Sequence, residues 1–365
     1  MYNVAIIGCG RISHKIAEGV AKNNDRMKLV VLCDPIEEKM FETEKTYNKK
    51  IENKLSLLKY KDYKEILDQN KIDIAIISTE SGYHEEIGLY FLENGVNLII
   101  EKPLAMSIEG AQKLVDTAKR NNLKLAASHQ NRFNYPIQLL KKAIKENKLG
   151  KIFNGMARIL WTRDDNYYLQ APWRGTWALD GGTLMNQCIH NIDLINWMMD
   201  DEIDTVYAQT SNYIRNIEAE DYGVILIRYK SGKIATIEGS AIIYPKNLEE
   251  TLTVTGEKGT VVIGGMAVNK INTWRVEGDN EQEYLSIDCG DPNSVYGYGH
   301  EALYKDFVDA LDENREPLVN GKAGLEAVKI ILAAYKSQKT GLPVKISEFN
   351  EFSTLDMEKK DVKYL

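Results

Sequence analysis

The sequence MYNVAIIGCGRISHKIAEGVAKN (residues 1–23) carries the pattern that decides the fold. Its apolar run Val4–Gly8 predicts a short strand that ends in glycine. The stretch Arg11–Asn23 predicts a helix, because apolar residues recur there at helical spacing on one face: Ile12, Ile16, Ala17 and Val20. Strand, glycine-containing turn and helix in this order predict the start of an alternating β/α domain.

Further apolar runs continue this alternation along the first third of the chain. They are Lys28–Cys33, Ile72–Ser78, Val96–Ile100 and Lys124–Ser128, and amphipathic stretches such as Ser107–Arg120 separate them. Runs that are apolar almost without interruption are typical of strands buried on both faces. We therefore predict a doubly wound parallel sheet with helices over residues 1–128.

The chain changes character beyond about Gly150. Stretches rich in Val, Ile, Thr and Tyr predict strands at Lys151–Trp161, Thr205–Tyr213, Tyr222–Tyr229, Lys233–Ile243, Glu250–Gly256, Gly259–Ile263 and Asn272–Glu277. One helix is expected at about Gly182–Met199, and two more follow, one containing Leu303, Phe307 and Leu311 and one at Leu325–Lys336. We predict an α+β domain over residues 129–350, built on a large, open, mostly antiparallel sheet with one face covered, and a tail over 351–365.

Composition narrows the classes of function. The 365 residues include 46 Lys and Arg against 53 Asp and Glu, so the net charge is −7, which argues against a general nucleic-acid or membrane-surface binder. No apolar run approaches the length of a membrane-spanning helix, and no signal peptide is expected, so we predict a cytoplasmic protein. The four cysteines form no Cys-x-x-Cys pair, which favours neither a disulfide framework nor a zinc site.

The glycine turn predicts a dinucleotide site. In the pattern Gly-x-Gly-x-x-Gly the glycines allow a sharp bend and a close approach to a pyrophosphate at a helix N-terminus; here Ser13 takes the third position. Two glycines alone also suit an ordinary tight turn. Asp34 ends the second predicted strand, where a carboxylate can bind ribose hydroxyls, although it also suits a turn before Pro35. No arginine follows at once to hold a 2′-phosphate, so we predict NAD rather than NADP.

Polar residues follow the next strands at the ends where a parallel sheet binds ligands. Thr79 and His84 follow one strand, and Glu101-Lys102-Pro103 follows the next. His84 also suits a helix cap, and Glu101 and Lys102 a solvated charge pair. The predicted cofactor-binding residues are Gly8, Gly10, Arg11, Ile12, Asp34, Thr79, His84, Glu101 and Lys102.

These motifs together resemble the family of glucose–fructose oxidoreductase and inositol dehydrogenase. A glycine-rich turn, a Thr-to-His segment and Glu-Lys-Pro after the fifth strand occur here in that family's order. The resemblance implies a Rossmann domain followed by a domain with a large open sheet. It also implies that Lys102 is catalytic and makes the bond before Pro103 a candidate for a cis peptide bond, a state that the sequence leaves open.

The inserted helix supplies a second candidate for catalysis. Asn186, His190 and Asp193 are spaced to share one face. A histidine there is often only a hydrogen-bonded core residue, and a metal site is disfavoured because no third ligand is suitably spaced. The family has a histidine at this position and usually an aspartate where this chain has Asn186. We predict His190 as general base, Lys102 as its hydrogen-bonding partner, and Asp193 as a candidate to orient the imidazole.

The stretch between Arg158 and Trp177 concentrates tryptophans, tyrosines and arginines. It suits either an aromatic loop that packs on the core or a surface for a ring and for anions. The stretch from Trp173 to Leu194 resembles the branch that oxidises UDP-N-acetylglucosaminuronic acid at C3, as does Ser294–His300. The predicted substrate-binding residues are Arg158, Arg163, Tyr168, Trp173, Arg174, Asn186, Gln187, His190, Asp193 and His300.

The branch resemblance implies a 3-keto sugar that feeds the synthesis of diacetamido sugars for surface polysaccharide. It also makes 2-oxoglutarate a candidate for recycling bound NADH, and a homo-oligomer, dimer or tetramer, is expected through the open sheet face. Three alternatives remain at this point: oxidation of UDP-N-acetylglucosamine, oxidation of another sugar or inositol, and a non-catalytic NAD-binding regulator.

Overall fold

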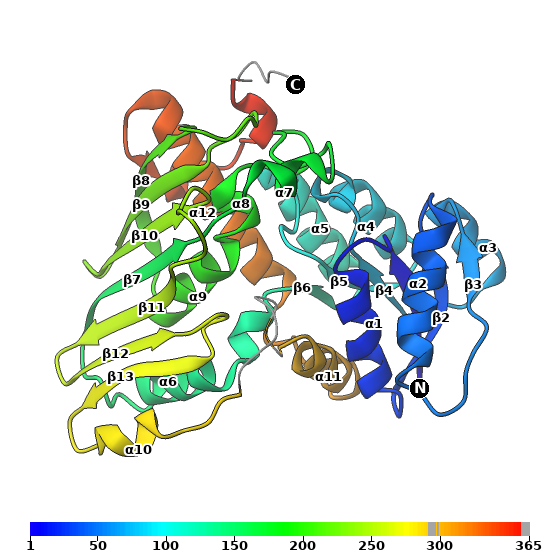
Figure 1. Ribbon diagram of the computed structural model, residues 1–365, viewed down its shortest axis with the longest axis horizontal. Helices are drawn as coiled ribbons and strands as arrows, with labels where there is room; N and C mark the ends of the chain where they lie inside the picture. Colours follow the sequence, from blue (N-terminus) through cyan, green and yellow to red (C-terminus); the bar gives the residue numbers. More distant parts are fainter. Residues whose placement is uncertain (291–296, 298, 359–365) are drawn as a thin grey trace. The chain divides into compact units, whose positions relative to one another are not determined.

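The computed structural model describes residues 1–290, 297 and 299–358 (Figure 1). By their contacts these residues form two compact units. The first comprises Met1–Met106, Gly110–Ser128 and His300–Leu325, and the second comprises Ser107–Glu109, His129–Gly299 and Glu326–Leu365. Part of the predicted tail and most of Ser294–Tyr298 lie outside the described residues.

The first unit contains a six-stranded parallel sheet in the order β3-β2-β1-β4-β5-β6. The strands are β1 (Tyr2–Ile7), β2 (Met27–Cys33), β3 (Leu58–Tyr60), β4 (Ile74–Ile77), β5 (Asn97–Ile100) and β6 (Leu125–Ala127). The predicted parallel sheet is confirmed; the short β3 has no apolar run, and its pattern gave no prediction. Strand order reverses between β1 and β4, and ligands of such sheets bind beyond the strand ends at this point.

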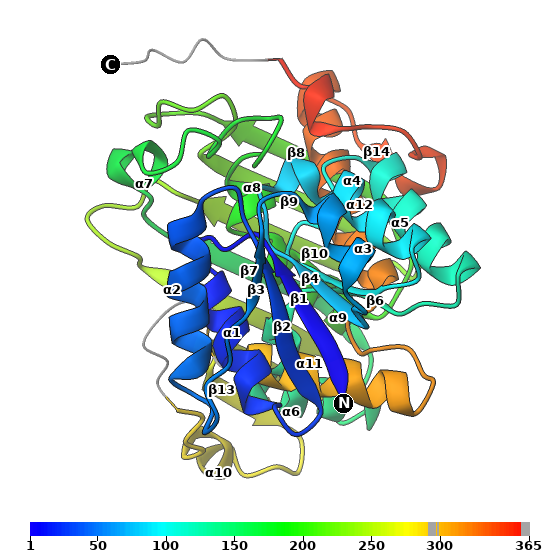
Figure 2. The same cartoon turned by 90° about the vertical axis from the view of Figure 1, so that its right-hand side faces the viewer.

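Helices cover both faces of this sheet, as Figure 2 shows. They are α1 (Ser13–Lys22), α2 (Glu37–Asn48), α3 (Ile66–Gln69), α4 (His84–Glu93) and α5 (Ile108–Arg120). In α5 the buried residues Ala111, Leu114 and Ala118 recur at helical spacing, which gives the helix one apolar face toward the sheet. Burial of such a face, rather than helix propensity, supplies most of the stability of helices of this length.

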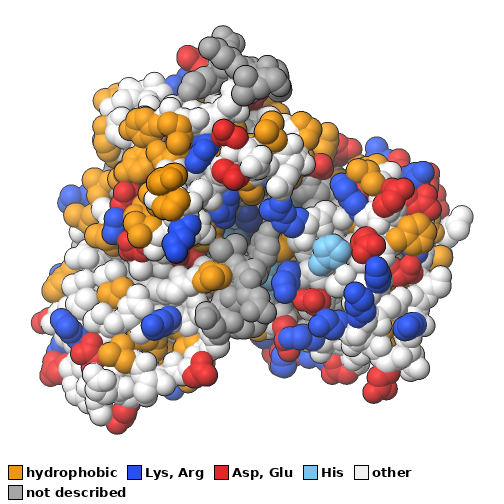
Figure 3. All heavy atoms as spheres, in the orientation of Figure 1, with side chains coloured by type: hydrophobic (Ala, Val, Ile, Leu, Met, Phe, Trp, Pro, Cys, Tyr) orange, Lys and Arg blue, Asp and Glu red, His pale blue; other side chains and the backbone are white. Residues whose placement is uncertain are grey.

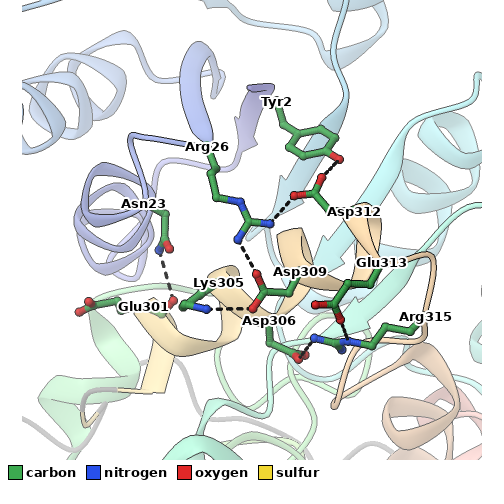
Figure 4. A network of polar contacts seen from close by, with 10 residues as sticks. All are labelled: Tyr2, Asn23, Arg26, Glu301, Lys305, Asp306, Asp309, Asp312, Glu313 and Arg315. Atoms are coloured by element: carbon green, nitrogen blue, oxygen red, sulfur yellow. Dashed lines mark hydrogen bonds and ion pairs between the residues drawn. The ribbon is translucent and has the colours of Figure 1, made fainter.

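Helix α11 (Gly299–Asp312) packs against α1 in the first unit, although we predicted residues 129–350 as the second domain. Figure 4 shows the polar contacts that hold it: Arg26 forms ion pairs with Asp309 and Asp312, and Asp312 also accepts a hydrogen bond from the Tyr2 hydroxyl at 2.6 Å. The Tyr304 ring lies so close to Gly19 that a β-carbon there would be 2.6 Å away. Periodicity predicts that a helix has an apolar face, but not which sheet or helix that face covers.

The second unit is built on an eight-stranded sheet in the order β13-β12-β11-β7-β10-β9-β8-β14. The β7–β10 pair is parallel and the other pairs are antiparallel, which confirms the predicted mostly antiparallel sheet. The strands are β7 (Ile152–Leu160), β8 (Ile203–Ser211), β9 (Tyr222–Tyr229), β10 (Ile234–Ser240), β11 (Glu249–Gly256), β12 (Gly259–Gly264), β13 (Lys270–Val276) and β14 (Val344–Lys345).

Among the described residues, helices cover one face of this sheet and leave the other face open. Helices of the unit include α6 (Tyr135–Lys145), α7 (Asp165–Leu169), α9 (Ile189–Met199), α10 (Glu281–Leu285) and most of α12 (Gly321–Thr340), of which α9 packs on β7, β10 and β11. Exposed apolar side chains remain on the strands: Phe153, Met156, Val224, Leu226 and Ile234. Figure 3 shows hydrophobic side chains gathered over β8, β9 and β10.

The inserted helix differs from the prediction of one helix over Gly182–Met199. The structure has α8 (Thr183–Asn186) and then α9, because the Thr183 carbonyl accepts hydrogen bonds from both Gln187 and Cys188 at 2.9 and 3.0 Å. Because one carbonyl accepts two N–H groups, the regular series of helical hydrogen bonds is interrupted at this point. The prediction of a single helix is therefore wrong: Asn186 ends α8, whereas His190 and Asp193 lie in α9.

Across the described parts of the chain, no helix is both long enough and apolar enough to span a membrane.

Candidate functional site

The glycine turn lies between β1 and α1 beside the end of β4. Gly8 has φ +91°, and a β-carbon on it would lie 2.6 Å from backbone atoms of Ser78 and Thr79. Gly10 has no atom within 4 Å of the place where a β-carbon would stand. The first glycine is thus required by the close approach of two loops, and the second leaves its backbone accessible, as a pyrophosphate site needs.

Replacing Gly8 by alanine is expected to destabilise the fold by about 2 kcal/mol or more and to weaken NAD binding. The left-handed backbone conformation disfavours alanine, and the clash is with backbone atoms that cannot rotate away. Urea unfolding and NAD titration measure the two effects. Gly278→Ala is the control, because this glycine lies at an exposed turn with similar φ (+83°) and open space around it, so only the backbone conformation is disfavoured. Equal losses of unfolding free energy in both variants would contradict a role for the close approach of Gly8 to Ser78 and Thr79.

Ser13 explains how the third glycine of the pattern can be replaced. Its hydroxyl donates to the Gly10 carbonyl at 2.7 Å and lies 2.8 Å from the hydroxyl of Thr43 on α2. The side chain is fully buried and polar contacts hold it. A small residue is sufficient here, and it fastens the turn to the start of α1.

Asp34 is fixed beside the glycine turn. One carboxylate oxygen accepts the Cys9 N–H and the other accepts the Ile36 N–H, both at 2.8 Å. Asp34 therefore stabilises the turn in which it lies, in agreement with the alternative that it suits a turn before Pro35. Because each oxygen accepts one bond and can accept another, the carboxylate also retains the capacity to bind ribose hydroxyls.

His84 joins the loops after β4 and β5. Its Nδ1 lies 2.7 Å from the Pro103 carbonyl oxygen and its Nε2 3.2 Å from that of Thr79. The ring is 1% exposed, and burial lowers the pKa of His84, although both carbonyls oppose that shift. With both nitrogens directed at backbone carbonyls, His84 holds the Glu101-Lys102-Pro103 segment in place, and its contact with the cofactor stays a prediction.

Glu101 and His300 lie together at the end of β5. Their Oε1 and Nε2 atoms are 3.8 Å apart, an ion-pair distance, and both side chains are buried. Burial alone would raise the pKa of Glu101, but His300, Lys102 and Ser128 together hold it below its ordinary value. Glu101 is thus a buried carboxylate next to the half-buried Lys102, whose bond to Pro103 is cis.

In the second unit, His190 lies in the first turn of α9 next to a histidine that the sequence analysis missed. The rings of His129 and His190 meet edge to face, with centroids 5.7 Å apart at 85°. His129 is fully buried. The position of His129 just after β6 is a signal that could have identified it as a site residue, because Thr79 and Glu101 also follow parallel strands.

Asp193 is bound by Arg132, another residue that the sequence analysis missed. The guanidinium donates from Nε and Nη2 to the two carboxylate oxygens at 2.7 and 2.6 Å, and both side chains are buried. Arg132 also lies over the Trp197 ring, 4.9 Å from its centroid. Each oxygen of Asp193 accepts one hydrogen bond from Arg132, so this aspartate anchors the guanidinium, and its role in orienting the His190 imidazole stays a prediction.

Asn186 and Gln187 belong to a polar chain around a narrow crevice. The Asn186 amide donates to Asp180 and accepts from Gln187 at 2.8 Å, and Gln187 is 3.1 Å from the Tyr167 hydroxyl. Tyr168 also lines the crevice. A carboxylate, Asp180, thus lies beside the position where this chain has Asn186.

The three predicted anion-binding arginines separate into two groups. Arg163 and Arg174 lie over the Tyr167 ring, 5.4 and 4.2 Å from its centroid, and Arg174 also lies 5.6 Å from the ring of Trp173. Arg158, on β7, is paired with Glu238 and Glu249, each at 3.0 Å. Arg158 is thus already paired with two carboxylates and its contact with a substrate anion stays a prediction, whereas the other two arginines lie together on an aromatic support.

Comparison with known proteins gives the family. Residues 2–129 match the NAD-binding Rossmann fold of an oxidoreductase family, and residues 141–346 match the C-terminal alpha/beta domain of that family. The chain belongs to this family. It is the predicted family of glucose–fructose oxidoreductase and inositol dehydrogenase, and the NAD-binding character of the first unit is thereby confirmed.

Individual relatives differ in the compounds that they bind or act on. The WlbA dehydrogenases of Bordetella pertussis and Chromobacterium violaceum, both solved in complex with NADH and UDP-GlcNAcA, are each 32% identical over 94% of this chain, with TM-scores of 0.84 and 0.85. The match covers 98% and 95% of those chains. Myo-inositol 2-dehydrogenase of Thermotoga maritima is 24% identical over 94% of this chain and 98% of its own length.

The oxidoreductase also buries two acids that the sequence analysis did not single out, Glu220 and Glu250. Glu220 accepts hydrogen bonds from the Leu184 N–H at 2.8 Å and the Tyr335 hydroxyl at 3.1 Å. Burial raises the pKa of each carboxyl to about 8. From the sequence, an acidic residue near the end of a strand is expected to be exposed to solvent. The neighbouring residues do not indicate which distant part of the chain covers it.

Glu220→Gln is expected to flatten the pH dependence of stability between about pH 5 and pH 8. Folding keeps the Glu220 proton in this range while the unfolded chain releases it, so stability falls as pH rises, by at most about 1.4 kcal/mol per pH unit for one carboxyl. Urea unfolding of both proteins across this range measures the slopes. If the unfolding free energies of the two proteins change with pH in parallel, burial does not raise the pKa of Glu220.

Proposed function

We propose that the protein oxidises the C3 hydroxyl of UDP-N-acetylglucosaminuronic acid to the 3-keto sugar, with NAD as the acceptor, in the synthesis of diacetamido sugars for surface polysaccharide. The observation that supports this most is the 32% identity, over 94% of the chain, to two dehydrogenases solved with NADH and UDP-GlcNAcA. The assignment of C3 rests on the resemblance of the stretch from Trp173 to Leu194 to that branch.

The proposed roles divide between two side chains. His190 removes the proton of the C3 hydroxyl, because a neutral imidazole is a suitable base near neutral pH. The Lys102 ammonium donates to the same oxygen and stabilises the negative charge that develops there. Bound NAD supplies the hydride acceptor at its nicotinamide ring. Glu101, a buried carboxylate beside Lys102, favours the charged form of the lysine that this role needs.

Arg163 and Arg174 are the proposed contacts for the anionic part of the substrate. Both guanidinium groups are supported by the Tyr167 ring. Guanidinium groups suit phosphate and carboxylate oxygens because they donate pairs of parallel hydrogen bonds.

A direct assay tests the proposal. Nucleotide released by heating the purified protein is identified first, and UDP-N-acetylglucosaminuronate is then added with and without 2-oxoglutarate while nicotinamide absorbance is followed. We expect turnover with the uronate and little with UDP-N-acetylglucosamine. Stimulation by 2-oxoglutarate would indicate recycling of bound NADH.

Inositol oxidation is the second candidate, favoured by the similarity to myo-inositol 2-dehydrogenase over 94% of the chain. Turnover of myo-inositol but not of either UDP-sugar would replace the first proposal with this one. Binding of NAD without turnover of any of these substrates would favour the non-catalytic regulator.

We also propose a homo-oligomer that buries the open face of the eight-stranded sheet. Met156, Val224 and Leu226 are exposed there, and exposed apolar sheet surface favours association. Sedimentation of the wild type and of Leu226→Lys tests this, since a charge on the open face should favour the monomer.

A further inference from the structure

Asp180 lies on the narrow crevice that Asn186 and Gln187 also line. It is 2% exposed, and its two carboxylate oxygens bind different segments of the second unit. Oδ2 accepts the Gly175 N–H at 2.7 Å, and Oδ1 accepts a hydrogen bond from the Asn186 side chain. One buried carboxylate thus joins the loop that carries Arg174 to the end of α8.

Two amide side chains continue the hydrogen bonds from Asp180 to an aromatic ring. The Gln187 Nε2 donates to the Asn186 Oδ1 at 2.8 Å and to the Tyr167 hydroxyl at 3.1 Å. Each amide has a donor end and an acceptor end, so every hydrogen bond in this chain has a direction.

The same chain reaches both arginines that we propose as anion contacts. The guanidinium groups of Arg163 and Arg174 lie over the Tyr167 ring, and Arg174 Nη1 also donates to the Tyr167 carbonyl at 2.5 Å. Gly175, whose N–H Asp180 accepts, directly follows Arg174 in the chain. The contacts therefore form a closed ring that begins and ends at Asp180.

Asp180 decides the direction of these hydrogen bonds. An ionised carboxylate only accepts, so the Asn186 side chain has to turn its Nδ2 toward Asp180 and its Oδ1 toward Gln187. Gln187 then has to donate to that oxygen through its Nε2, the atom that also holds the Tyr167 hydroxyl. One carboxylate thus fixes the orientation of both amides.

We propose that Asp180 is a positioning residue for the substrate: by fixing the direction of this chain, it holds Arg163 and Arg174 in place for the anionic part of the substrate. The inference rests on the proposed UDP-sugar, whose phosphate and carboxylate oxygens suit guanidinium groups. In this role Asp180 acts through the two amides and not by contact with the substrate. Its loss should therefore affect substrate binding, and hence KM, more than kcat.

Three variants test the direction of the chain. In Asp180→Asn the Gly175 N–H keeps the amide oxygen, so an NH₂ group faces the NH₂ group of Asn186. Asn186→Asp places two carboxylates against each other. In the double variant Asp180→Asn/Asn186→Asp, the introduced amide accepts the Gly175 N–H and donates to the introduced carboxylate, which still accepts from Gln187. All three hydrogen bonds are then kept, with the two groups exchanged.

Two measurements on the full-length protein give the readouts. Titration of the NADH-loaded protein with UDP-N-acetylglucosaminuronate gives a Kd without turnover, and steady-state kinetics with NAD give KM and kcat. Each single variant should raise KM and Kd about tenfold and change kcat by less than about threefold. The double variant should return both constants to within about threefold of wild type. A merely structural role would lower the free energy of unfolding and leave KM and Kd unchanged.

Asp279→Asn is the matched control, at a partly buried aspartate of the same unit that lies outside the ring of contacts. Its carboxylate accepts the Trp274 indole N–H at 2.9 Å and the Lys148 ammonium at 3.0 Å. This variant should leave KM and Kd unchanged.

The double variant decides the test even if a single variant fails to fold, because it keeps the hydrogen bonds of the chain. A double variant that binds no better than the single variants would overturn the inference. Unchanged binding in Asp180→Asn, or no binding of the uronate by wild type, would overturn it as well.

Failure of the proposed function gives a different result. Binding of the uronate that Asp180→Asn weakens and the double variant restores, without turnover by wild type, would keep the role of Asp180 and reject the proposed reaction. Turnover of the uronate by wild type, with binding indifferent to Asp180, would do the reverse.

Discussion

Replacing His190 by asparagine is expected to lower kcat on UDP-N-acetylglucosaminuronate by about 10²–10⁴-fold, while NAD(H) stays bound. An asparagine amide is close in size to imidazole and can hydrogen-bond, but it cannot accept a proton near neutral pH. Lys102→Met is expected to have a similar effect, since it preserves the aliphatic length and removes only the ammonium group.

Two measurements make this prediction specific. Nucleotide released by heat reports whether the NAD site persists, and steady-state kinetics report the loss of turnover. If both side chains act on one oxygen, the double variant should be little worse than either single variant, because groups that act together are not additive. His14→Asn, at an exposed histidine of α1, and Lys113→Met, at an exposed lysine of α5, are the matched controls. Near-normal rates in both test variants would remove the proposed roles.

The fold was predictable because its determinants are local. Continuous apolar runs such as Lys28–Cys33 indicate strands buried on both faces, and the observed β2 extends over Met27–Cys33. The end of a helix is less predictable: spacing alone placed Asn186 and His190 on one helix, yet a single carbonyl, that of Thr183, accepts two amides and divides it.

The partners of charged residues were the least predictable part of the site. Arg158, Arg163 and Arg174 look equivalent in the sequence, but Arg158 stands directly opposite Glu238 on the neighbouring strand and is neutralised there. This pairing depends on strand register, which connects residues 80 positions apart. The tertiary structure decides which charges remain for a ligand.

Asp193→Asn is expected to destabilise the protein by about 3–5 kcal/mol, the largest stability effect that we predict. The substitution keeps the shape of the side chain but leaves the buried Arg132 guanidinium without its counter-charge. Arginine side chains keep their charge in folded proteins, so the cost of a buried, uncompensated charge remains in the folded state. Because α9 also carries His190, we expect kcat to fall as well.

The measurement is urea unfolding of a double-mutant cycle with Arg132→Met, Asp193→Leu and the variant that carries both substitutions. Removing both charges should cost less than the sum of the two single losses, because no unpaired ion is then left in the core. Glu18→Gln, which breaks the partly exposed pairs with Lys15 at 3.1 Å and Lys50 at 3.8 Å, is the control and should change stability by less than about 1 kcal/mol. If Asp193→Asn costs no more than this control, the buried pair does not hold α9, and the position of His190 must depend on the apolar contacts of that helix with β7 and β10.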